Sequence, residues 1–60
     1  MTFNLTIKMD NEAFDDDLYV ELQRLLERVK TGLVYQCREA ELYDVNGNKV
    51  GEYMIIGRPR

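Results

Sequence analysis

The sequence contains no histidine, and it has a single cysteine, Cys37, among its 60 residues. Without histidine, a zinc site built from cysteine and histidine ligands is excluded, and the thiol lacks the base that usually activates a catalytic cysteine. A lone cysteine also excludes a disulfide within the chain. A chain of this length buries only about 60% of the surface that its unfolded form exposes, so its stability needs additional support. Neither a metal nor a cofactor is expected. Oligomerisation or docking on a partner therefore remains as the source of additional stability.

Long apolar runs are also missing. No segment approaches the roughly 20 apolar residues of a membrane-spanning helix, and the first residues alternate between polar and apolar where an export signal would have a basic and then an apolar region. Together with the single thiol, these absences predict a cytoplasmic protein that does not enter the membrane. The sequence has no glycine-rich phosphate loop and no serine-centred nucleophile motif, so enzymatic activity is not expected.

Charge is unevenly distributed along the chain, whose net charge is −3. Residues 1–27 hold seven acidic and two basic side chains, a net charge of −5, whereas residues 28–60 hold four acidic and six basic ones, a net charge of +2. A negatively charged domain repels phosphate backbones, so nucleic acid is not the expected partner. An acidic surface instead attracts basic protein surfaces.

One long helical pattern covers residues 16–31. Apolar residues recur along it at spacings of four, three and four, with one further leucine beside the stripe: Leu18, Leu22, Leu25, Val29 and Leu26. Either Asp15 or Asp16 is expected to cap the start of the helix. Gly32 is expected to end it in a left-handed conformation.

Three further segments have the pattern of strands. In residues 2–9 apolar and polar side chains alternate, which is typical of a strand with one buried face. Residues 37–43 and 49–56 form the arms of a hairpin around residues 44–48, whose Asp-Val-Asn-Gly sequence suits a type I turn. Residues 33–36 are either a linker or the start of the first arm. The resulting order predicts an α+β fold, a two-layer β-α-β-β sandwich in which one helix packs on a three-stranded sheet with a C-terminal β-hairpin.

Residues 1–60 are expected to form a single small domain. Phe14 should fold back beneath the start of the helix, and Cys37 should be buried as a small apolar side chain. Residues 57–60 are expected to be a flexible basic tail, because proline and the terminal position both disfavour continued strand pairing.

The sheet face that the helix leaves uncovered is the expected site of interaction. The arm at residues 49–56 carries apolar side chains on both faces, so a helix on one face cannot bury all of them. An exposed apolar patch usually marks an interface. The candidate interface residues are Tyr35, Tyr43, Met54 and Ile56, together with the acidic Asp15, Asp16 and Asp17.

Several polar motifs have more than one interpretation. Residues 15–17 are interpreted as a helix cap with solvated acids, and the alternatives are a metal or general-base cluster and an acidic contact for a partner. Residues 44–48 share part of the calcium-loop pattern, but the glycine comes too early and flanking helices are missing, which favours a hairpin turn. Gly57-Arg58-Pro59-Arg60 contains the Gly-Arg-Pro core of hooks that enter the minor groove of DNA, with Ile56 where such hooks carry an arginine.

Three stretches together resemble a known group of proteins: residues 10–16 (Asp-Asn-Glu-Ala-Phe-Asp-Asp), the leucine-rich residues 22–29 and residues 44–51. The combination is similar to that of very short proteins encoded by bacteriophages and prophages, mostly without assigned function. Departures from that group in residues 33–40 and at Met54 and Ile56 add hydrophobic surface. The resemblance implies a phage origin and the fold described above rather than an activity.

These observations predict a class of function rather than a reaction. The leading hypothesis is a non-enzymatic phage or mobile-element protein that acts in the host cell by binding a host or phage protein. Its most specific form is an anti-defence, anti-CRISPR-like inhibitor that covers the basic surface of a host immune complex. One alternative is a homodimeric accessory or structural protein whose apolar patch serves its own assembly, and another is a small regulator whose basic tail contacts DNA.

Overall fold

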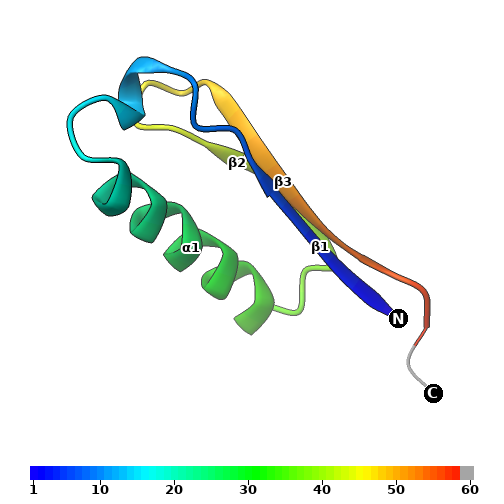
Figure 1. Cartoon of the computed structure of the whole chain (residues 1–60). Helices are drawn as coiled ribbons and strands as arrows, with labels where there is room; N and C mark the ends of the chain where they lie inside the picture. Colours follow the sequence, from blue (N-terminus) through cyan, green and yellow to red (C-terminus); the bar gives the residue numbers. More distant parts are fainter. Residues whose placement is uncertain (59–60) are drawn as a thin grey trace.

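A computed structural model describes residues 1–58 and shows one α-helix packed on a three-stranded antiparallel sheet (Figure 1). In chain order the elements are β1 (Thr2–Ile7), the short 3-10 helix η1 (Glu12–Phe14), α1 (Leu18–Val34), β2 (Glu39–Tyr43) and β3 (Lys49–Ile56). The predicted α+β class and the β-α-β-β order are confirmed. Of the predicted basic tail, residues 59–60 lie outside the described part of the chain.

The central strand of the sheet is β3, because the strand order is β1-β3-β2 with both pairings antiparallel. Tyr53, near the middle of β3, lies opposite Leu5 on one side and Ala40 on the other. These three side chains therefore share the sheet face that α1 covers, since directly opposite residues point to the same face. β1 and β2 are the two edges of the sheet.

A β-bulge interrupts the pairing of β2 with β3. Leu42 lies opposite Gly51, but the next residue, Tyr43, lies opposite Lys49, so Val50 is an extra residue in β3. Val50 and Gly51 are both buried. The bulge therefore lets β3 direct an additional apolar side chain into the core beside the hairpin turn.

The start of α1 differs from the prediction. The capping residue is Asp17, whose Oδ1 accepts hydrogen bonds from the N–H groups of Tyr19 and Val20, each at 3.1 Å. Neither Asp15 nor Asp16 caps α1, so that prediction was wrong. The physical reason is η1, whose C-cap is Asp15 and which shifts the start of the longer helix toward the C-terminus.

The end of α1 also differs, because Gly32 lies inside the helix and does not terminate it. The helix continues to Val34, and the left-handed residue that follows it is Gln36, at φ 60°. The ring of Tyr53 passes so close to Gly32 that an added Cβ atom would lie 2.1 Å from the Tyr53 hydroxyl oxygen. Gly32 therefore serves close packing of the helix on β3 and not a helix stop.

The core contains six buried apolar side chains from every element except β1: Phe14, Leu25, Val29, Leu42, Val50 and Tyr53. Burial of Phe14 confirms that this residue folds back beneath the start of α1. Cys37 is exposed, so its predicted burial was wrong. The helix extends three residues beyond its predicted end, which places Cys37 in the surface connection to β2.

The molecule is elongated, with principal extents of 43 × 19 × 18 Å. Its accessible surface is 4871 Å², whereas a compact monomer of this mass exposes about 4,100 Å². The chain thus leaves roughly 800 Å² more surface exposed than a compact fold of its size would.

Candidate protein-binding surface

The sheet face away from α1 is polar over most of its area. Because Leu5 and Ile7 pack against the core, the alternating residues of β1 point to the opposite face. By the same alternation and the pairing register, this outer face carries Thr2, Asn4, Thr6, Glu39, Glu41, Tyr43, Lys49, Glu52, Met54 and Ile56. It is therefore a mixed, mostly hydrophilic surface.

The four aromatic and apolar residues predicted to form an interface are all exposed, but the structure does not bring them together. Met54 and Ile56 lie on the outer face of β3, and Tyr43 lies toward the hairpin end of β2. Tyr35 lies on a different part of the molecule, at the C-cap of α1. Their exposure was predictable, yet they do not form the single apolar patch expected on the outer face.

The charges of the outer face compensate one another within the chain. The Nζ atom of Lys49 lies 3.8 Å from carboxylate oxygens of both Glu41 and Glu52, which face each other across β2 and β3. The Tyr43 hydroxyl donates a hydrogen bond to Glu41. This hydrogen bond, with help from Lys49, lowers the pKa of the Glu41 carboxyl, and it raises the pKa of the Tyr43 phenol.

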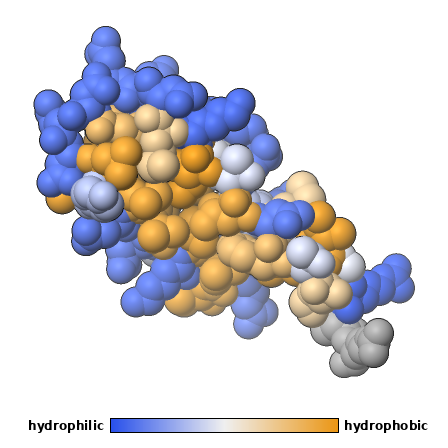
Figure 2. Space-filling view, viewed as in Figure 1, coloured by the Kyte–Doolittle hydropathy of each residue, from blue (hydrophilic) through white to orange (hydrophobic). Residues whose placement is uncertain are grey.

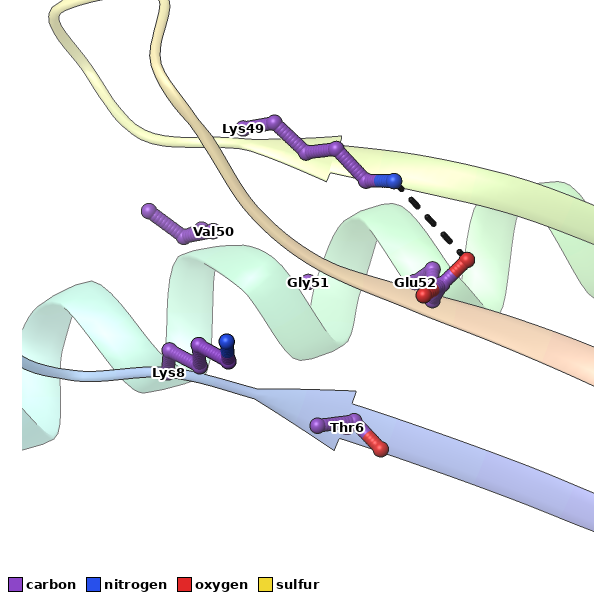
Figure 3. Close-up of a pocket in the computed structure, with 6 residues that line it drawn as sticks. All are labelled: Thr6, Lys8, Lys49, Val50, Gly51 and Glu52. Atoms are coloured by element: carbon purple, nitrogen blue, oxygen red, sulfur yellow. Dashed lines mark ion pairs between the residues drawn. The ribbon is translucent and has the colours of Figure 1, made fainter.

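A shallow hollow of about 240 Å³ lies on the sheet between β1 and the first residues of β3 (Figure 3). Thr6 and Lys8 line it from the side of β1, and Lys49 and Glu52 line it from β3, joined by their ion pair. Val50 and Gly51 complete its lining. It is therefore a small depression of mixed polar and apolar character.

The three consecutive acids at the start of α1 do not converge on one point. Asp17 is occupied as the cap of α1, Asp15 is the C-cap of η1, and Asp16 is exposed beside them. Within residues 1–58, no group of three or more cysteine, aspartate or glutamate side chains is arranged to hold a metal ion. The acids instead give this end of the molecule a negative surface.

A buried carboxylate, Asp44, joins the hairpin turn to the loop before η1. Its Oδ1 accepts from the backbone N–H groups of Asn46 and Asn48, each at 2.9 Å, and its Oδ2 accepts from the Asn11 side-chain amide at 2.6 Å. Only 5% of Asp44 is exposed. The hydrogen bond from the Asn48 backbone, with those from Asn46 and Asn11, lowers the pKa of the Asp44 carboxyl.

The depressed pKa of Asp44 predicts a loss of stability in acid that depends on this residue. Its contribution to folding is present above the ordinary carboxyl pKa of about 4 and is lost as the pH falls through the lower pKa of the folded state. Asp44→Asn should lower the thermal midpoint at pH 7 and make it fall less between about pH 5 and pH 2 than in the wild type. Asp16→Asn removes the same charge at an exposed position and is the matched control. Equal slopes for both variants in thermal scans by circular dichroism would contradict this role.

A further apolar surface lies between α1 and β1. On α1, residues at spacings of three, four and seven form a flank beside the buried stripe: Tyr19, Leu22, Leu26 and Leu33. On β1, the inner face adds Phe3, Leu5 and Ile7. Phe3, Leu26 and Leu33 are 46%, 44% and 40% exposed. We call this surface the α1–β1 groove.

Figure 2 shows the apolar atoms of this side as a band that follows the long axis of the molecule, bordered by polar residues. The view is that of Figure 1, in which β1 lies in front of β3, so the band runs along the open side of the sandwich. The apolar surface is therefore continuous, in contrast to the scattered residues of the outer face.

The groove has a simple geometric origin. A three-stranded sheet is roughly 14 Å wide, whereas a helix with its side chains is about 10 Å across, so one helix covers about two strands. α1 lies toward β2, where Arg24 donates a hydrogen bond to the Tyr43 carbonyl at 3.0 Å. Arg24 also pairs with the buried Glu21 at 2.5 Å, which fixes the polar flank of the helix on that side. The inner face of β1 is consequently left open.

Sequence reasoning assigned the apolar side of residues 2–9 to a buried face and counted Leu26 with the apolar stripe of the helix, and so it missed the groove. The signal that could have identified it is the second stripe, in which Leu22, Leu26 and Leu33 repeat at spacings of four and seven. A helix with two adjacent apolar stripes has more apolar surface than one narrow sheet can cover.

The structure thus defines a small α+β protein with one helix on a three-stranded antiparallel sheet and an open apolar groove at the β1 edge. Comparisons with protein families, with curated proteins and with solved structures gave no match to this chain. Across the described residues, no helix combines the length and the apolar character needed to cross a membrane.

Proposed function

We propose that this protein acts by binding another protein through the α1–β1 groove and that it carries out no catalysis. The observation that supports the proposal is the continuous apolar surface of the groove, in which Phe3, Leu26 and Leu33 are each at least 40% exposed. A 60-residue chain can build only a small hydrophobic core, so leaving these side chains outside the core lowers its stability. Contiguous exposed apolar surface with a polar rim is characteristic of protein interfaces.

A narrower proposal concerns the kind of partner. The acids at one end of the molecule are exposed beside the groove: Asp10, Glu12, Asp15, Asp16 and Asp17. An apolar groove with an acidic end suits a partner with a basic surface, such as the nucleic-acid channel of a host immune complex. Together with the resemblance to phage proteins, this supports an anti-defence inhibitor that acts in the host cell.

The proposal is tested by site-specific photo-crosslinking in bacterial cells that produce the protein. The photoreactive residue benzoylphenylalanine replaces Leu26, on the groove flank of α1, or Val20, an exposed apolar residue on the other side of the same helix. Both positions are exposed and helical, so they form a matched pair. We expect Leu26→benzoylphenylalanine to give a covalent protein adduct at least about tenfold more abundant than Val20→benzoylphenylalanine, because only position 26 lies in the interface core.

The mass of the adduct identifies the partner. An adduct with a component of a host immune complex supports the inhibitor, and an adduct of twice the chain mass supports self-association. No adduct, or equal adducts from both positions, would overturn binding through the groove.

A further inference from the structure

β1 is an edge strand whose free side points its hydrogen-bonding groups outward. The N–H group of Lys8, just after β1, donates to the Val50 carbonyl of β3 at 2.7 Å. In an antiparallel strand, successive residues direct their N–H and C=O groups alternately to one side and the other. Phe3, Leu5 and Ile7 therefore direct theirs away from β3, toward the open edge.

The two edges of the sheet differ in charge. β2 reads Glu-Ala-Glu-Leu-Tyr and carries Glu39 and Glu41, and charged side chains of this kind protect an edge against pairing with another chain. β1 reads Thr-Phe-Asn-Leu-Thr-Ile and carries no charged residue. Only β1 is thus suited to accept a further strand without charge repulsion.

A second copy of β1 fits this edge in one natural register. Antiparallel pairing about a two-fold axis at Leu5 places Leu5 opposite Leu5 and Phe3 opposite Ile7 of the second copy. The outward N–H and C=O groups then form the hydrogen-bonded pairs of the ladder. A shift by one residue would put apolar side chains opposite polar ones. Only registers that place apolar side chains opposite apolar side chains are therefore favourable.

This arrangement also continues the α1–β1 groove across the axis. The inner faces of the two β1 strands form one surface, bordered on both sides by the apolar flanks of the two α1 helices.

The charge distribution favours the same antiparallel arrangement. The acids of residues 10–17 lie at the end of the molecule where β1 finishes, and Arg38 lies at the opposite end, donating to the Gly57 carbonyl at 2.6 Å (Figure 1). Antiparallel pairing of two β1 strands brings the acidic end of each copy toward the basic end of the other.

We infer that the partner of the α1–β1 groove is a second copy of this chain, which pairs through β1 to give a six-stranded antiparallel sheet with both helices on one face. The inference rests on the general form of the proposed function, binding through the α1–β1 groove, and it names a second copy as the partner in place of the basic protein surface of the narrower proposal. In this dimer Asn4 of each copy lies opposite Thr6 of the other copy on the outer face. The symmetry makes this pair occur twice.

The register is tested by sedimentation equilibrium on a matched pair of double variants. Asn4→Glu/Thr6→Lys places opposite charges face to face across the axis, and Asn4→Lys/Thr6→Lys places like charges there. Both share Thr6→Lys, which faces Glu52 of the same chain, so any effect on folding at that position is common to the two. We expect the wild type to be dimeric at tens of micromolar and the like-charge variant to have a dissociation constant at least about tenfold above that of the opposite-charge variant.

Amide hydrogen exchange gives a second measurement that needs no substitution. The N–H groups of Phe3, Leu5 and Ile7 should be protected in concentrated wild-type protein and exchange freely in dilute protein, whereas Asn4 should stay protected in both. A monomeric wild type, equal dissociation constants for the two variants, or outward amides without concentration-dependent protection would each overturn the dimer. If the wild type is monomeric and position 26 still captures another protein, this inference fails and the proposed function stands.

Discussion

Gly51→Ala is expected to lower the free energy of unfolding by about 3 kcal/mol and the thermal midpoint by at least about 12 °C. A Cβ atom at this position would lie 2.2 Å from the Thr6 carbonyl oxygen and 3.1 Å from the Ile7 Cα atom. Both are backbone atoms of β1, which cannot move aside as a side chain does, so the strand itself must shift away from β3. For a 60-residue domain with a stability of roughly 3–9 kcal/mol, this is a large share of the total.

The matched control is Gly47→Ala in the hairpin turn. No atom lies within 4 Å of the Cβ position at Gly47, whose φ of 84° imposes only the backbone cost of about 1 kcal/mol. Urea unfolding of both variants separates the two effects. If Gly51→Ala were no more destabilising than Gly47→Ala, the close approach of β1 to β3 would not be a determinant of the fold.

Gly32→Ala should have an effect whose sign depends on Tyr53. Alanine is favoured over glycine inside a helix by about 1 kcal/mol, but the added methyl group would lie 2.1 Å from the Tyr53 hydroxyl oxygen. Because Tyr53 is fully buried in the centre of the core, its ring has little room to retreat. We expect a net loss of about 1–2 kcal/mol in the wild-type background.

The same substitution in a Tyr53→Phe background removes the clashing oxygen atom. There Gly32→Ala should become neutral or stabilising, which gives a coupling between the two positions of at least about 1 kcal/mol in a double-mutant cycle. The hydrogen bond from the Tyr53 hydroxyl to the Cys37 carbonyl is absent from both proteins that carry Tyr53→Phe. Its loss therefore cancels in the cycle. If the two substitutions had additive effects, the contact between Gly32 and the Tyr53 ring would not be the cause of the destabilisation by Gly32→Ala.

The sequence was most informative where structure is set by local periodicity. The alternation in residues 2–9 and the leucine spacing of α1 predicted a strand and a helix that the structure contains. The ends of the helix were predicted wrongly for tertiary reasons. The start was displaced by η1, and the end was misplaced because Gly32 accommodates the Tyr53 ring, a contact between residues 21 positions apart.

The candidate surface was less predictable than the fold. Exposure of Met54 and Ile56 follows from strand alternation, and it was anticipated. Whether α1 lies over β1 or toward β2 depends on contacts such as the hydrogen bond from Arg24 to the Tyr43 carbonyl, which joins residues far apart in the chain. The width of the sheet relative to the helix decides how much of the inner sheet face is left uncovered. The periodicity of the sequence gives no information on these widths.

The position of β3 in the sheet has a consequence for the order of events during synthesis. β3 is synthesised after β1 and β2, yet it is the strand that pairs with both of them. Neither β1 nor β2 has a neighbour in the sheet until residues 49–56 have emerged from the ribosome, so the sheet cannot assemble before β3 has been made. Until then β1 has both edges free, and a nascent chain is most exposed to pairing with the wrong strand during that interval.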